Sequence, residues 1–182
     1  KQRDPVIVAP TRLADVSTTI GVDAIVEQEQ LATVDFLKID VDGPDLDVLE
    51  SAKDVFGAKQ VLGVGVEVNW VGTASRLDHT FHNTDLFLRE RGYTLFSFTS
   101  RQYSRNALPG GFLADCLYAQ TSYGQPYQGD AVYVRDLVAP HERANAGAYP
   151  AEKLLKLACI YELIGLPDCA AEAVLHFRDR LE

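Results

Sequence analysis

The sequence contains no methionine, so the chain as written does not begin at a start codon, and we expect it to be a piece of a longer protein. It also lacks a surplus of basic residues. Its 26 aspartates and glutamates outnumber its 17 lysines and arginines, which gives a formal net charge of −9 at pH 7. This acidic balance argues against nucleic acid or an anionic membrane as the main partner.

Long apolar runs and paired cysteines are missing too. No run approaches the roughly 18 residues of a membrane-spanning helix, and no signal peptide is visible. Cys116, Cys159 and Cys169 are scattered and form no CxxC pair, which favours buried thiols in a reducing compartment. The sequence therefore predicts a cytoplasmic protein with no membrane partner.

A metal site is not predicted either. His79 and His82 stand close together in "HTFH", but no clear third ligand accompanies them. The glycines of "GVGVE", residues 63–67, do not predict a phosphate-binding loop, because they lie within an expected strand and no helix opens after them.

What is present suits an α/β domain, with 47% hydrophobic residues. The patterns predict strands at 34–40, 60–68, 93–98 and 129–136, a possible strand at 6–10, and helices within 11–31, at 44–56 and at 84–92. Strands separated by single helices predict a mostly parallel sheet, buried on both faces. The last strand follows the third without a helix, so we expect it to lie antiparallel beside the third.

The remainder divides into a long loop and a helical tail. Residues 99–128 form an expected loop of about 30 residues, a length that is usually functional or disordered. Residues 1–138 are expected to form the α/β domain, and 139–182 a linker with two helices, 151–165 and 168–182. We expect this helical hairpin to pack on the sheet domain or on another copy, which makes a homo-oligomer possible.

The stretch "VDFLKIDVDGPDLDVLESA", residues 34–52, places unusual charge at the exit of an apolar strand. Side chains alternate along a strand, so Lys38 and Asp40 share one face and their head groups can meet. Two interpretations stay open: a buried ion pair that fixes a helix, or a polar site at the strand end. The acids Asp42, Asp45 and Asp47 also suit the amino end of a helix.

The next strand repeats the pattern. "VEVNW" places Glu67 and Asn69 on one face near its carboxyl end, with Trp70 just beyond. Adjacent parallel strands would bring Asp40 and Glu67 to one edge, where two neighbouring carboxylates push their pKa values apart, as general-base chemistry requires. A merely solvated rim is the alternative.

Four segments together resemble the carboxyl half of the FkbM-type S-adenosylmethionine-dependent methyltransferases. They are "TRLADV", "VDFLKIDVDGPDLDVLESA", "VLGVGVEV" and "FLRERGYTLFSF", and the likeness covers about residues 5 to 136. Asp42 replaces the usual Glu, and Ala14 separates Leu13 from Asp15. The resemblance implies a Rossmann-like sheet that uses S-adenosylmethionine. The family's glycine-rich cofactor turn is absent from this chain.

The resemblance also implies residue roles. Asp40 would lie near the sulfonium of the cofactor and would position or deprotonate an acceptor hydroxyl, with Lys38 orienting it and Glu67 closing the other side. Trp70, Arg101 and Tyr103 would contact the acceptor, a carbohydrate or natural product. The alternative is a non-catalytic half-domain whose helical tail binds proteins.

Overall fold

The computed structural model describes residues 19–103, 113–114, 117–118 and 120–182. The possible strand at 6–10 and Cys116 lie outside these residues. The helices are α1 (Val22–Gln28), α2 (Asp45–Glu50), α3 (Lys53–Ala58), α4 (Phe81–Arg89), α5 (Arg143–Ala146), α6 (Ala151–Leu163) and α7 (Pro167–Leu181). The strands are β1 (Phe36–Ile39), β2 (Gly63–Asn69), β3 (Thr94–Phe98), β4 (Arg101–Tyr103), β5 (Leu113–Ala114), β6 (Leu117–Tyr118), β7 (Gln120–Thr121) and β8 (Gln125–Val134).

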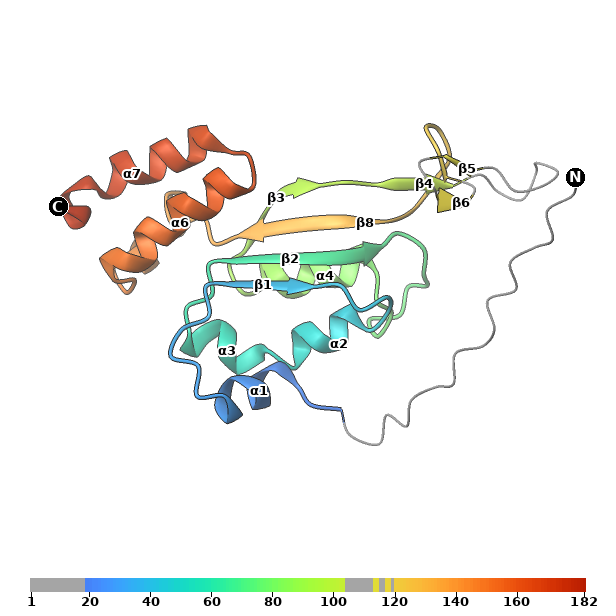
Figure 1. Cartoon of the computed structure of the whole chain (residues 1–182), viewed down its shortest axis with the longest axis horizontal. Coiled ribbons are helices and arrows are strands. Elements are labelled where there is room, and N and C mark those ends of the chain that lie inside the picture. Colours follow the sequence, from blue (N-terminus) through green and yellow to red (C-terminus); the bar gives the residue numbers. More distant parts are fainter. Residues whose placement is uncertain (1–18, 104–112, 115–116, 119) are drawn as a thin grey trace, which may run out of the picture.

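The main sheet is mixed, and its last strand lies inside it (Figure 1). β1 and β2 pair in parallel, whereas β8 pairs antiparallel with β2, β3 and β4. The three strands predicted to share one direction do so, and β8 runs antiparallel beside β3 as expected. The prediction of a mostly parallel sheet was wrong, because β8 separates β2 from β3. Among the strands that the structure describes, only β1 and β2 form a parallel ladder.

The predicted loop at 99–128 was also wrong in part. β8 already begins at Gln125, and β4 pairs with both β8 and β7. These short antiparallel ladders extend the sheet beyond the carboxyl end of β2, so residues 101–103 are fixed by backbone hydrogen bonds.

The predicted helix at 44–56 is interrupted at Ser51 and Ala52. The Ser51 hydroxyl donates to the Val48 carbonyl at 2.7 Å and accepts from the Val22 amide at 3.0 Å. Asp23 then accepts hydrogen bonds from the Asp54 and Val55 amides at 3.1 and 2.9 Å, which caps the start of α3. The short predicted helix in 11–31, which is α1, thereby stabilises the break.

One face of the sheet forms the main core. Val64, Val66 and Val68 of β2 and Ala131 and Tyr133 of β8 are buried there, packed with the helices α2, α3 and α4. The other face is polar and partly exposed toward the carboxyl ends of β1 and β2. β1 is therefore not covered on both faces as predicted, and Phe36 is 37% exposed.

The helical tail packs at the opposite end of the sheet from these carboxyl ends (Figure 1). Its two helices confirm the predicted hairpin, joined through Gly165 and Leu166. A second core cluster joins the tail to the sheet through Leu62 and Val134, and the rings of Phe96 and Tyr161 lie 5.1 Å apart. The division at residue 138 stays a prediction. Within the described residues, no helix has the length and apolar character needed to cross a bilayer.

Candidate active site

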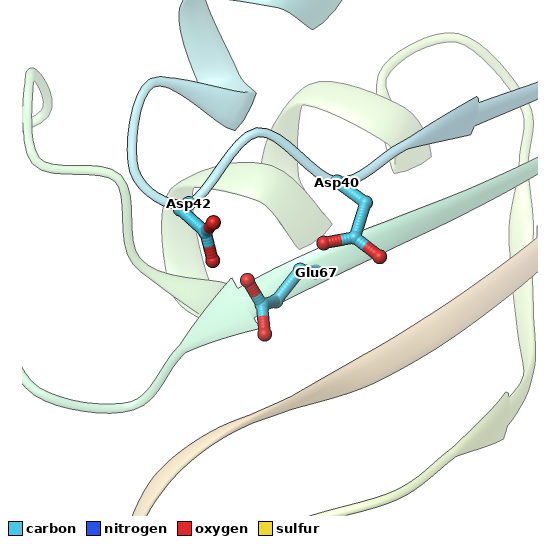
Figure 2. A group of neighbouring side chains, drawn as sticks. All are labelled: Asp40, Asp42 and Glu67. Atoms are coloured by element: carbon cyan, nitrogen blue, oxygen red, sulfur yellow. The ribbon is translucent and has the colours of Figure 1, made fainter.

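Three carboxylates converge where β1 and β2 end. Oxygen atoms of Asp40, Asp42 and Glu67 all lie within 4.8 Å of one another. Figure 2 shows the three side chains pointing toward one another, Asp40 and Asp42 from the segment after β1 and Glu67 from β2. The parallel pairing of Phe36–Ile39 with Gly63–Val66 sets this juxtaposition. The sequence prediction that Asp40 and Glu67 meet at one edge is confirmed.

The loop after β1 is shaped by a fourth acid. Asp45 is buried, and its carboxylate accepts hydrogen bonds from the amides of Val41 and Gly43, both at 3.2 Å. Asp42 has a φ of 52°, a conformation that aspartate tolerates better than most residues. Asp45 therefore holds a tight turn that directs Asp42 into the cluster, a role beyond stabilising the helix start.

Lys38 and Asp40 form an ion pair that is open to solvent. Lys38 Nζ lies 3.0 Å from Asp40 Oδ2, and each side chain is 53% exposed. A second carboxylate, Asp130 of β8, lies 3.7 Å from the same nitrogen. The interpretation as a buried ion pair is wrong, because no helix covers this part of the sheet among the described residues. The exposed pair favours a polar site.

Glu67 is the most enclosed carboxylate of the cluster, with 11% of its side chain exposed. Its Oε1 accepts hydrogen bonds from Arg101 at 2.9 Å and from Gln128 at 3.0 Å. Burial raises the pKa of Glu67 above its ordinary value, with help from the negative charges of Asp40 and Asp42 and against the bond from Arg101. A carboxylate in this state accepts a proton more readily than an exposed one.

Two residues of β8 that the sequence prediction missed complete the network. Asp130 lies opposite Glu67 and Gln128 lies opposite Asn69 in the β2–β8 ladder. Arg101 bridges Glu67 and Asp130, with one nitrogen 2.9 Å from Glu67 and the other 3.0 Å from Asp130. Alternation along "QGDAV" puts Gln128, Asp130 and Val132 on one face, but only the sheet order shows which strand they meet.

The glycines of β2 make room for the charged face. A Cβ on Gly63 would lie 2.7 Å from the Phe36 ring, and one on Gly65 would lie 3.4 Å from the Lys38 stem. The two glycines let β1 side chains lie flat across β2. They are within the strand, as the sequence predicted, and do not form a phosphate loop.

The residues predicted to contact an acceptor lie around the same rim. Trp70 packs against Phe81 and Phe98, with ring centroids 4.4 and 6.0 Å away, and its buried Nε1 has no hydrogen-bond partner. Tyr103 is half-buried and makes an edge contact with Tyr127 at 5.5 Å. Arg101 is instead held by carboxylates, as described above.

A cavity of about 400 Å³ opens beside the carboxylates. Gly43, which follows Asp42, and Asn69, which lies on the same face of β2 as Glu67, both line it. His79, Thr80 and Tyr127 contribute further polar atoms, and the buried Nδ1 of His79 has no hydrogen-bond partner. The cavity is thus rich in hydrogen-bonding groups, and Asp78 adds one carboxylate to its lining.

The carboxylates can hold a cation. Three oxygen ligands suit Mg²⁺ or Ca²⁺, and the positive sulfonium of S-adenosylmethionine is a second fit for the same charge. The sequence analysis predicted no metal. The group of possible ligands does not include His79, whose Nε2 lies 3.8 Å from Asp47, and His82 lies on α4.

Comparisons with curated proteins and with solved structures gave no match. A family model described as the methyltransferase FkbM domain matches residues 2–95. The match spans just over half of the chain and includes β1, the acidic turn and β2, the segments that supply Asp40, Asp42 and Glu67. The chain therefore belongs to the FkbM methyltransferase domain family.

Proposed function

We propose that this domain is part of an S-adenosylmethionine-dependent O-methyltransferase that acts on a hydroxyl of a carbohydrate or natural product. The observation that carries the proposal is the convergence of Asp40, Asp42 and Glu67 at the carboxyl ends of two parallel strands. Ligands of α/β sheets bind at such edges. The free thiols of Cys159 and Cys169 suit a cytoplasmic location.

The site fits one end of the cofactor. Negative charge from Asp40 and Asp42, both exposed, suits a sulfonium cation at the rim. The adenosyl end needs a glycine-rich turn, which we expect from a Rossmann-like half supplied outside this chain. β1 is the edge of the described sheet, and Phe36 and Val41 are exposed there, so a further strand has room to pair. When bound, the cofactor supplies the methyl group.

The chain's own residues would handle the proton. In this mechanism Asp40 accepts the proton of the acceptor hydroxyl, because its Oδ1 is not engaged by Lys38. Lys38 orients Asp40 through the bond to Oδ2, at 3.0 Å. Glu67, fixed by Arg101, closes the other side and maintains the negative field. Positioning of the hydroxyl contributes the rest.

The acceptor would occupy the neighbouring cavity of about 400 Å³. Asn69, His79 and Tyr127 offer hydrogen bonds to neutral hydroxyls, and Trp70 and Tyr103 offer aromatic faces at the rim. Polar groups without a partner, such as His79 Nδ1, favour an acceptor that donates or accepts hydrogen bonds.

The test measures methyl transfer to a panel of sugars and polyhydroxylated natural products by a protein that contains this domain and a glycine-rich cofactor half. Asp40→Asn should lower turnover by about 10²-fold or more while leaving the melting temperature nearly unchanged. Leu175→Asn, on the exposed face of α7, serves as the matched control and should leave turnover unchanged. Full turnover by Asp40→Asn together with early unfolding would make Asp40 a structural anchor and reject the mechanism.

The isolated chain provides a second check. Residues 1–182 alone should bind S-adenosylmethionine weakly or not at all by calorimetry, because the glycine-rich turn is absent. A micromolar dissociation constant would show that the cofactor site lies elsewhere in this chain.

A second candidate function is self-association through the tail. Leu155, Cys159 and Leu163 form an exposed stripe on α6, where the two leucines are 52% and 84% exposed. If two α6 helices pair antiparallel about Cys159, Leu155 faces Leu163 of the second copy and Lys156 faces Glu162. The apolar side chains of the stripe therefore meet each other in this pairing, which favours a second copy as the partner. Lys156 already pairs with Asp35 and Glu152 of its own chain, so the leucines carry the argument.

Disulfide trapping tests this pairing. Mild oxidation of the chain in a Cys116→Ser, Cys169→Ser background should give a dimer linked through Cys159, and Leu163→Asp should suppress it. Leu175→Asp, which changes an exposed leucine on α7, is the control and should leave trapping unchanged. Equal trapping in both variants would reject the proposed pairing.

A further inference from the structure

A second cavity lies at the end of the sheet opposite the carboxylates. It has a volume of about 430 Å³ and lies between α3, the turn after α4 and the segment that leads from β8 into the tail. Figure 1 shows α3 and the end of β8 on the side of the sheet where the tail lies, away from the carboxyl ends of β1 and β2. The volume lies in the range of small-molecule sites, which often form where two parts of a protein meet.

The charges around this cavity contrast with those of the whole chain. Lys53, Arg91 and Arg135 line it, and no carboxylate does, although the chain has a net charge of −9. Glu142, 3.6 Å from Arg135, is the nearby counter-ion. Among the residues that the structure describes, Lys53 and Arg91 have no carboxylate within salt-bridge distance. After Glu142 is counted, two positive charges remain uncompensated.

The turn after α4 is built closely around Arg135. Gly92 has a φ of +80°, and a Cβ there would lie 2.9 Å from Arg135 Nη1 and equally close to Glu142. Arg135 donates to the Arg91 carbonyl, and its buried Nε lies 3.6 Å from a Glu142 carboxylate oxygen. Arg135 is therefore fixed in the wall of the cavity, with Glu142 as its counter-ion.

Arg91 is also held in place beside the cavity. Its guanidinium carbon lies 3.5 Å from the centre of the Phe87 ring, and Nη1 donates to the Phe87 carbonyl at 2.9 Å. This anchoring uses one nitrogen, so the remaining N–H groups stay available. A fixed guanidinium with free donors is well suited to bind phosphate oxygens.

We infer that this cavity binds the phosphate group of a small phosphate ester. Two uncompensated cations match the charge of about −2 that a phosphate monoester carries near neutral pH. Arg91 and Lys53 hold the phosphate, and Arg135 adds the third cation. Phe56 and Ala148 supply an apolar wall for the organic part. Because Ala148 and Tyr149 precede α6, the ligand joins the sheet domain to the tail, independently of methyl transfer.

Calorimetry on the 182-residue chain tests the site with two probes, inorganic phosphate and phenyl phosphate, in chloride buffer at constant ionic strength. We expect saturable 1:1 binding of both, tighter for phenyl phosphate because its ring meets Phe56. Arg91→Gln should weaken binding about 10-fold, as expected for a charged hydrogen bond. The more exposed Lys53→Gln should weaken it roughly threefold. Arg76→Gln, an exposed arginine away from this cavity, should have no effect.

Two results would overturn the inference. One is the absence of saturable binding, at up to roughly 10 mM of either probe, by a chain that melts cooperatively. The other is equal weakening by Lys53→Gln and Arg76→Gln, which would indicate diffuse attraction instead of a site. Because Lys53 is exposed, its substitution tests the site even if Arg91→Gln fails to fold.

Discussion

β1 has a lysine–aspartate pair near each end, and the two pairs differ in almost every respect except chemistry. Lys38 and Asp40 lie 3.0 Å apart at the carboxyl end, each about half exposed. Lys153 and Asp35 lie 2.7 Å apart at the amino end, with side-chain exposures of 7% and 27%. The same ion pair therefore serves an open site at one end and a structural joint at the other.

The surroundings explain the difference. Lys153 comes from α6, and its ammonium also donates to the carbonyls of Val34, Lys59 and Gln60 at 3.2, 2.7 and 3.1 Å. It thereby ties the tail to the segments that enter β1 and β2. Lys38 contacts carboxylates only, so a ligand can rearrange it at little cost to the fold.

The largest expected effect on stability is at the amino end of β1. Lys153→Met should lower the free energy of unfolding by about 3–5 kcal/mol, because it leaves Asp35 and three carbonyls without their buried donor. Urea denaturation measures this loss. A loss below about 1 kcal/mol would mean that water replaces the ammonium and that Lys153 does not stabilise the contact between the tail and the sheet.

Acid should weaken the same ion pair between Lys153 and Asp35. Partial burial alone would raise the pKa of Asp35, but hydrogen bonds and charge from Lys153 and Lys156 outweigh it and lower the pKa below its ordinary value of 3.8. A lowered pKa contributes stability above about pH 4 that is lost as the pH falls through the folded-state value. Asp35→Asn should therefore cost about 2 kcal/mol at pH 7 and much less near pH 2. Melting curves at both pH values check this, and an equal loss at both would contradict it.

Substitution at the carboxyl end should have a small effect on stability. Lys38→Met should change the free energy of unfolding by less than about 1 kcal/mol, as for other exposed ion pairs. In an active methyltransferase it should reduce turnover much more, because Asp40 loses its orienting partner. The same urea experiment used for Lys153→Met provides the comparison. A loss near that of Lys153→Met would make the two pairs equivalent and remove the contrast.

The smallest expected effect concerns Glu67. Burial, together with Asp40 and Asp42, raises its pKa above the ordinary value of 4.5, so the folded state holds this proton to higher pH than the unfolded chain. Stability should therefore fall as the pH rises above about 4.5 through the folded-state pKa. Glu67→Gln should flatten this part of the stability profile. An unchanged slope would mean that another group titrates there.

Period-two alternation was enough to predict that Lys38 meets Asp40, because the two residues lie two positions apart in the same segment. It also predicted that Asp40 meets Glu67, because β1 and β2 are adjacent parallel strands. Arg101 could not be assigned this way. Its bonds to Glu67 and Asp130 depend on three strands, β2, β4 and β8, that are far apart in the sequence. The same applies to the burial of β1, since a strand's pattern does not show which neighbours cover it.

The break between α2 and α3 shows a second limit. Residues 44–56 have a helical pattern throughout, yet Asp23 caps α3 and Ser51 contacts α1 across about 30 positions of sequence. Local propensity gave the helical segments, and a tertiary contact decided where one ended and the next began. The relative directions of the strands were accordingly predicted better than their order in the sheet.

The position of β8 has a consequence for synthesis of the chain. Residues 63–69 find their antiparallel partners at 128–134, and β3 reaches β2 only through the same strand. While the chain emerges from the ribosome, β2 and β3 therefore lack their antiparallel partner until β8 has been synthesised, which takes nearly three quarters of the 182 residues. Strands without their partners are prone to aggregate. Arrested nascent chains ending before residue 125 should therefore depend on chaperones more than chains extended beyond β8.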